Sequence, residues 1–220
     1  GPVYIGAVVW LLFFIGLFTI KKPIKWILVI LILFSLTLAW GKYFPLITNL
    51  FLDYFPLYNK FRTVSMILVV VEFAVPLLGA IGIYYLWNSD MEVKEKIHIL
   101  FKSSGILILT SVFFLVFGNL LFEFKSITDG QFPTWFSNAL INDRISIYKS
   151  DILRSMVLIF IATSIIYFAI NRYKKQNFTW VYILAVLIFL DLWFVNKRYF
   201  NHDSFLVKSK VETPFQIQDF

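Results

Sequence analysis

Two pairs of basic residues stand next to long apolar stretches of this sequence and could bind phosphate groups. Lys60 and Arg62 lie just before one such stretch, in the segment YNKFR, and Lys197 and Arg198 follow another. A guanidinium group can hold two phosphate oxygens at once, and a lysine ammonium adds a point charge. The pairs indicate a site for a lipid phosphate or diphosphate. The simpler alternative is that they only anchor helix ends among charged headgroups.

A second set of basic residues comes with acidic neighbours. Arg144 follows Asp143, and Arg154 lies three residues after Asp151. These arginines could be counterparts of the first two pairs at the same phosphate site, or they could form local ion pairs. Neighbouring acids and bases on a helix surface usually contribute little to stability. Both interpretations stay open on the sequence alone.

Glu72 lies about ten residues inside an apolar stretch, which is roughly 15 Å deep at the helical rise of about 1.5 Å per residue. An ionised carboxylate is costly there, so it has to be paired, protonated or turned toward a polar cavity. Pro76 follows four residues later and removes the hydrogen bond that the Glu72 carbonyl would accept. The pattern predicts a substrate pocket or proton site, or else a protonated side chain bonded to a neighbouring helix.

Asp191 is the second acid within an apolar stretch. It stands about four residues from the end of that stretch, which places it roughly 6 Å below the membrane surface. It is predicted to form part of a pocket wall facing the outer loops. The alternative is a snorkelling or paired acid near Lys197 and Arg198.

Several classes of site are excluded by composition and motif. The chain has no cysteine and only two histidines, so neither a thiolate nucleophile nor a metal site is expected. There is no phosphate loop, GxSxG elbow or HExxH motif, and no voltage-sensor or selectivity-filter pattern. The net charge is +7, but the basic residues flank apolar stretches, so no nucleic-acid partner is expected.

These residues are carried on apolar stretches long enough to cross a bilayer. Hydrophobic residues make up 60% of the 220 residues, and charged ones only 15%, whereas soluble domains average about 45–50% and about 25%. A bilayer core requires about 17–25 apolar residues per helix. We therefore predict an all-α, polytopic transmembrane helical bundle of about six spans. They cover residues 3–20, 24–40, 63–87, 102–122, 153–171 and 178–195, within a transmembrane domain at 1–200.

Basic residues in the short connections predict the orientation of the bundle. The connections 21–25 and 172–176 each carry three Lys or Arg, which favours the cytoplasmic side. Alternation then places 88–98 inside, and 41–62, 123–152 and both chain ends outside. The aromatic outer loops predict short interfacial helices, including an amphipathic helix at 132–152 that leads into the fifth span.

Both ends of the chain look cut, which predicts a piece of a longer protein. The sequence begins almost at an apolar stretch, and it ends in a polar segment without a closing element. We expect residues 201–220 to start an extracytoplasmic tail or a truncated C-terminal domain.

Several segments resemble the bacterial YfhO family of large multi-spanning membrane proteins. They are GPVYIGA at 1–7, AWGKYF at 39–44, FLDYFPLYNKFRTVSM at 51–66, NDRISIYKSDILRS at 142–155 and LDLWFVNKRYFNHDSF at 190–205. The resemblance implies a GT-C-type membrane architecture in the bacterial inner (cytoplasmic) membrane. The chain would correspond to the C-terminal half of the membrane domain.

The resemblance also implies an activity. Such enzymes take a sugar from a polyprenyl-phosphate carrier on the outer face and pass it to a cell-envelope polymer. Their general base lies in a first outer loop that this chain would lack. No catalytic residue is therefore assigned, no cofactor is expected within this chain, and the chain alone is not expected to turn over. Expected partners are the lipid bilayer, a lipid-linked sugar donor and the rest of the parent chain.

We expect one set of residues to surround the carrier headgroup. Lys60, Arg62, Arg144 and Arg154 are predicted to line the anionic site. The full predicted substrate-binding set is Asp53, Tyr58, Lys60, Arg62, Glu72, Arg144, Arg154, Asp191, Lys197 and Arg198, in which the three acids form a polar wall.

Two other functions fit the same composition. A transporter or flippase-like protein would use Glu72 as its coupling or proton site, but it should show broken helices in two repeated halves. Only Pro76 clearly interrupts a span here. A non-enzymatic membrane scaffold should instead tolerate the loss of Glu72 or Arg62.

Overall fold

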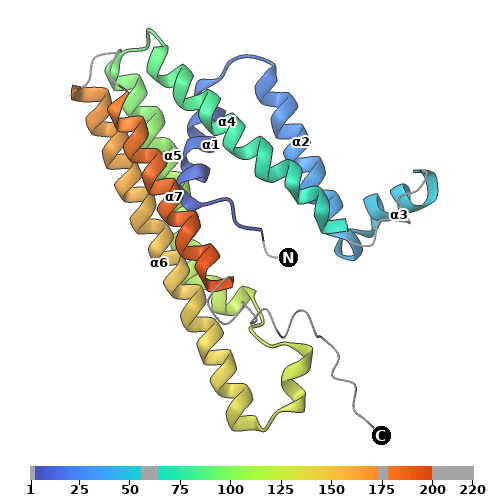
Figure 1. Cartoon of the computed structure of the whole chain (residues 1–220). Coiled ribbons are helices and arrows are strands. Elements are labelled where there is room, and N and C mark those ends of the chain that lie inside the picture. The colour runs from blue at the N-terminus through green and yellow to red at the C-terminus, as the bar shows by residue number, and fades with distance from the viewer. Residues whose placement is uncertain (1–2, 56–63, 173–177, 200–220) are drawn as a thin grey trace, which may run out of the picture.

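The computed structural model describes residues 3–55, 64–172 and 178–199, and throughout these ranges the regular structure is helical (Figure 1). Four helices are long and apolar enough to cross a membrane, and two shorter apolar helices precede them. The predicted all-α membrane bundle is therefore confirmed. The predicted tail at 201–220 and the residues Tyr58, Lys60 and Arg62 lie outside the described residues.

Seven α-helices and three short 3₁₀ turns follow one another along the described chain. The α-helices are α1 Ala7–Thr19, α2 Ile24–Ala39, α3 Pro45–Tyr54, α4 Leu68–Asn88, α5 Val93–Leu121, α6 Thr134–Arg172 and α7 Thr179–Tyr199. The 3₁₀ turns are η1 Gly41–Tyr43, η3 Val64–Ile67 and η4 Ile127–Gln131. The turn η3 runs directly into α4, so the apolar segment there covers Ser65–Asn88.

Four of the predicted spans coincide with helices to within a few residues, and two helices are longer than predicted. Helix α5 begins at Val93, well before the predicted start at 102, so much of the loop predicted at 88–98 is helical. Helix α6 has 39 residues, or about 58 Å. It includes both the predicted amphipathic helix at 132–152 and the fifth span, because no proline or glycine interrupts residues 134–172. The predicted amphipathic helix and the fifth span are therefore parts of one continuous helix.

Helix α1 occupies the centre of the bundle. It contacts α4 on one side and α5, α6 and α7 on the other, while α2 packs against α4. Its side chains Val8, Leu11 and Ile15 are completely buried. They belong to an apolar cluster shared with α4 to α7, whereas Val9 and Phe13 of α1 belong to a second cluster shared with α2 and α4. At 13 residues it is about 20 Å long, shorter than a bilayer core of about 30 Å.

Glycines allow α1 and α4 to touch backbone to backbone. A Cβ atom at Gly82 would overlap the backbone of Gly16, and a Cβ at Gly16 would lie 2.5 Å from the carbonyl oxygen of Leu78. A Cβ atom at a third glycine, Gly79, would likewise lie only 3.0 Å from the Cβ of Leu12. Lipid provides no hydrophobic drive for helix association, so close packing of small residues is a main source of helix–helix affinity in membranes.

The helix connections separate onto two ends of the bundle. In Figure 1 the α1–α2 and α4–α5 connections and the end of α6 lie at the top, whereas the first residues, α3 and η4 lie toward the other end. The arrangement agrees with the predicted alternation of spans, although the side facing the cytoplasm stays a prediction. Helix α3 has no buried residue and exposes Leu46 and Tyr54, as expected for a short helix in an aromatic outer loop.

We predict that Gly82→Ala destabilises the bundle by about 1–3 kcal/mol, because the new methyl group forces α1 and α4 apart. The matched control is Gly105→Ala in α5, where a Cβ meets no atom within 4 Å. That change should be neutral, or stabilise the helix by up to about 1 kcal/mol. Denaturant unfolding in detergent micelles measures both. Equal stability of the two variants would contradict the proposed close contact.

Candidate functional site

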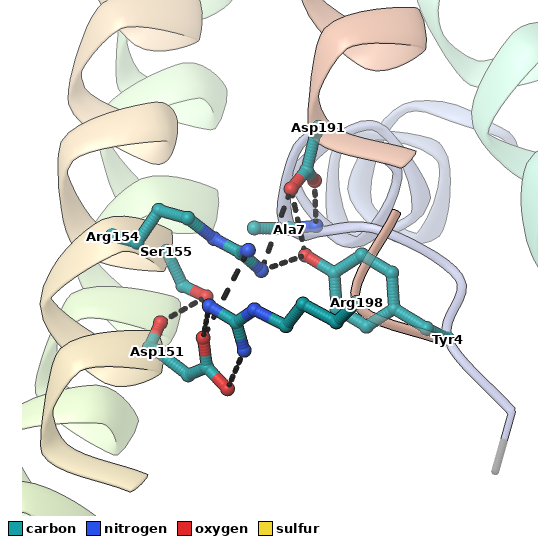
Figure 2. Close-up of polar contacts among 7 residues, drawn as sticks. All are labelled: Tyr4, Ala7, Asp151, Arg154, Ser155, Asp191 and Arg198. Atoms are coloured by element: carbon teal, nitrogen blue, oxygen red, sulfur yellow. Dashed lines mark hydrogen bonds and ion pairs between the residues drawn. The ribbon is translucent and has the colours of Figure 1, made fainter. Parts of the chain in front are cut away.

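Asp191 of α7 is buried at the meeting point of α1, α6 and α7. Its side chain is almost inaccessible, and the residue is 3% exposed. The Tyr4 hydroxyl donates to Oδ1 over 2.8 Å, and the Ala7 backbone N–H donates to Oδ2 over 2.9 Å (Figure 2). The Arg154 guanidinium lies 3.7 Å from Oδ1. The carboxylate therefore has a hydrogen-bond partner on each oxygen and a positive charge close by.

Asp191 acts as the N-terminal cap of α1. Gly6, the residue at the cap position, has no side chain to bond the first N–H groups, and its φ of 99° lies in a region that favours glycine. A Cβ at Gly6 would come within 3.2 Å of Asp191 Oδ2. The free N–H groups and the helix dipole give a helix start a partial positive charge, which a carboxylate stabilises. Helix α7 thus supplies the cap that α1 lacks in its own sequence.

Arg154 and Arg198 extend this network from the middle of α6 to the C-terminal end of α7. Arg154 donates to the Tyr4 hydroxyl over 3.1 Å and lies 3.8 Å from Asp151, one turn earlier in α6. Arg198 contacts both oxygens of Asp151, at 2.7 and 2.8 Å (Figure 2). The four ionisable groups form a chain of alternating charge, in which two carboxylates meet two guanidinium groups. We call Tyr4, Asp151, Arg154, Asp191 and Arg198 the outer network, after the side of the membrane on which the sequence predicts it.

The structure brings together only part of the predicted site. Arg154, Asp191 and Arg198 meet in the outer network, and Lys197 is exposed beside Arg198 on α7. Asp53 on α3 and Glu72 on α4 are both exposed and have no partner among the described residues. The predicted set is therefore distributed over several surfaces, and its role in binding stays a prediction.

Arg144 lies elsewhere and fastens the loop between α5 and α6. Its guanidinium makes two contacts with Asp129 of η4, one of them 2.8 Å long, and donates to the Phe124 carbonyl over 2.8 Å. Asp129 also accepts from the Ser126 N–H in a capping box. The Arg144 hydrogen bonds and then the Ser126 N–H lower the pKa of Asp129 to about 2. The local ion-pair interpretation of Arg144 therefore applies, although its partner is Asp129 and not the adjacent Asp143.

Two important residues of these networks were not singled out from the sequence. Asp129 follows Ser126 by three residues, a spacing typical of a capping box, so a local signal existed. Tyr4 has no such signal, since its partners Asp191 and Arg154 are 187 and 150 residues away.

The described surface offers cations and apolar area but no evident catalytic group. The side chains of Arg198 and Arg154 are 45% and 25% exposed. Within the described ranges no three acidic or histidine side chains gather closely enough to hold a metal. A groove of about 440 Å³ between α5 and α6 is lined by aromatic rings and by Ser104, Thr163 and Ser164, whose hydroxyls bond carbonyls of their own helices. At about 100° per residue it faces away from Arg154.

We predict that Asp191→Ala lowers the free energy of unfolding by about 3–5 kcal/mol, because it leaves Arg154 without its buried counter-ion and the Ala7 N–H without an acceptor. Tyr4→Phe removes one hydrogen bond and should cost about 1 kcal/mol. The control Asp143→Ala, at an exposed position of α6, should stay within about 0.5 kcal/mol of the wild type. Unfolding in detergent micelles gives all three values. A loss for Asp191→Ala no larger than that of Asp143→Ala would refute the capping role.

We predict that acid loosens the loop that carries Asp129. A carboxyl with a lowered folded pKa contributes stability above its unfolded value of 3.8, and that contribution disappears as the pH falls through about 2. Asp129→Asn should therefore increase pepsin cleavage in residues 122–133 at pH values above the unfolded pKa. The difference from wild type should vanish at the acid end, while Asp143→Asn should match wild type throughout. If the ratio of the cleavage rate in Asp129→Asn to that in wild type did not change with pH, the link between the Asp129 carboxylate and the stability of the loop would be ruled out.

No family model, no curated protein and no solved structure matches this chain. What is established is therefore the architecture itself, an all-α integral membrane bundle with apolar helices in contact with the lipid bilayer.

Proposed function

We propose that this chain is the carrier-binding part of a GT-C-like membrane glycosyltransferase that uses a polyprenyl-phosphate-linked sugar to glycosylate a cell-envelope polymer. The proposal rests on the segments that resemble the YfhO family and on the basic residues at the C-terminal end of α7 and in the middle of α6. Its place would be the bacterial inner membrane, with both ends of the chain on the outer side. The catalytic base would lie in another part of the parent protein.

The exposure of the Arg198 side chain is the observation that supports the binding proposal most directly. Its guanidinium is 45% exposed although it pairs with Asp151, so it has donors available for a second anion. Lys197 is exposed next to it, and Arg154 lies on the other side of Asp151 at 3.8 Å. Arg198 and Arg154 thus share the carboxylate of Asp151, and a third cation, Lys197, is exposed one residue from Arg198. A phosphate could bind there without displacing the buried part of the network.

The position of this group along the helices supports a headgroup ligand. Arg198 lies one residue before the described end of α7, after an apolar span. Lysine and arginine at that level interact with lipid phosphate. Lys60 and Arg62, which precede α4, belong to the same predicted outer surface.

A non-enzymatic scaffold is the second candidate, and the charge balance of the outer network favours it. Two acids and two arginines neutralise one another there. A set of side chains that is already neutral requires no ligand, and its role can be simply to orient α1, α6 and α7. The two functions differ in whether the exposed arginine has a ligand.

We predict that Arg198→Ala weakens binding of polyprenyl phosphate about tenfold, because a hydrogen bond to a charged group contributes about 1.5–3 kcal/mol. Binding is measured on the complete protein in nanodiscs with a fluorescent polyprenyl phosphate. Arg172→Ala is the matched control, since Arg172 is also exposed but ends α6 on the opposite side of the bundle.

Transfer of sugar from the carrier is then followed with the same variants. A loss of carrier binding and of sugar transfer that is confined to Arg198→Ala supports the proposed site. Binding that is equal in both variants would reject the site at α7, and the absence of binding and turnover with every carrier sugar would favour the scaffold.

A further inference from the structure

Helix α4 carries an acid on a face that the rest of the described bundle leaves uncovered. Its residues Ala74, Val75 and Leu78 are buried completely against α1 and α2. On the other side Val69 is 62% and Phe73 68% exposed, and Glu72 is exposed between them in sequence. We call Val69, Glu72, Phe73 and the Pro76 turn the Glu72 face.

Glu72 lies too deep to reach the aqueous surface. It stands seven residues after Ser65, the start of the membrane-spanning segment, which is about 10 Å at the helical rise. A glutamate side chain is short, and the residues that snorkel over such distances are Lys and Arg. Among the described residues none forms an ion pair or hydrogen bond with this carboxylate. An acid left in hydrocarbon without a partner is strongly unfavourable.

Pro76 adds a second acceptor to the same turn. It is the proline inside α4, and it lacks the N–H that would bond the carbonyl of residue 72. In membrane helices such freed carbonyls are satisfied by side chains of neighbouring helices or by water. The Glu72 face therefore presents two acceptors, a carboxylate and a backbone carbonyl, and no described donor.

We infer that the Glu72 face docks against a further membrane-spanning segment that carries a Lys or Arg side chain at this depth. Lipid tails offer no donor, so they cannot satisfy either acceptor. A second copy of this chain related by a two-fold axis would set two Glu72 carboxylates against each other, which is repulsive. A cationic helix neutralises the acid and bonds the free carbonyl, and the apolar residues Val69 and Phe73 pack around the pair. The inference does not depend on the proposed function.

The test uses the natural absence of cysteine from this chain. A single spin label is placed at Phe73→Cys in the complete protein in nanodiscs. Its accessibility to lipid-dissolved oxygen and to a water-soluble nickel chelate is measured by electron paramagnetic resonance. Reference labels sit at Leu109→Cys in α5 and Phe189→Cys in α7, whose side chains are 71% and 61% exposed within the spans.

The docked segment should shield position 73 from both reagents, whereas the reference labels stay open to oxygen. Adding Glu72→Lys, which repels a cationic partner, should raise oxygen access at position 73 to the reference level. Glu72→Gln, which keeps a hydrogen-bond acceptor, should raise it less. Val69→Cys serves as a second label position should the change at Phe73 prevent folding.

Four results would overturn the inference. Oxygen access at position 73 equal to that at 109 and 189 would mean that the face contacts lipid. Access of the nickel chelate would mean a water-filled cavity, as in a substrate or proton site. A short spin–spin distance between two labels at position 73 would mean that a second copy covers the face. If Glu72→Lys left position 73 as shielded as before, the segment that covers it would carry no cationic side chain at this depth.

Discussion

The bond between the Asp191 carboxylate and the first turn of α1 is the interaction on which this bundle depends. Helix α1 touches four other helices, so its position determines where they stand. Yet α1 is short, and its start has no capping side chain of its own. Unpaired N–H groups at a helix start are costly away from water. Asp191 satisfies one of them, and Tyr4 and Arg154 in turn satisfy Asp191.

The C-terminal ends of α1 and α4 follow the same rule with the opposite charge. The Lys25 ammonium donates to the Leu17 carbonyl in the last turn of α1 over 3.2 Å. The Lys96 ammonium donates to the carbonyls of Trp87 and Ser89 at the end of α4, at 3.3 and 2.9 Å. Cations at helix C-termini complement both the free carbonyls and the helix dipole. A basic residue that indicates the orientation in the sequence, such as Lys25, therefore also caps the C-terminus of a helix.

The long helix α6 links the outer network to the outer loop. One face of its outer half holds Arg144 against η4, and Tyr148 bonds the Phe114 carbonyl of α5 over 2.9 Å. Gly118 makes room for that tyrosine, since a Cβ there would overlap its ring. Less than two turns after Tyr148, Arg154 meets Asp191. The loop, the α5–α6 pair and the α1 cap are thus connected through one continuous helix, which gives the charged residues around Asp151 a rigid support.

The sequence by itself determined that this is an all-α membrane bundle, and it located α2, α4 and α7 to within a few residues. Whether an apolar stretch enters the hydrocarbon depends on the composition of that stretch alone, so the local sequence is sufficient to locate a span. The uninterrupted length of α6 was harder to predict, because polar residues at 137–152 are equally compatible with a separate surface helix. The partners of Asp191, the contact of Gly16 with Gly82 and the uncovered position of Glu72 were decided only by the tertiary structure. Each depends on which helix faces lie together across more than 30 residues of sequence, and a charge or a glycine in a single apolar stretch does not indicate its distant neighbour.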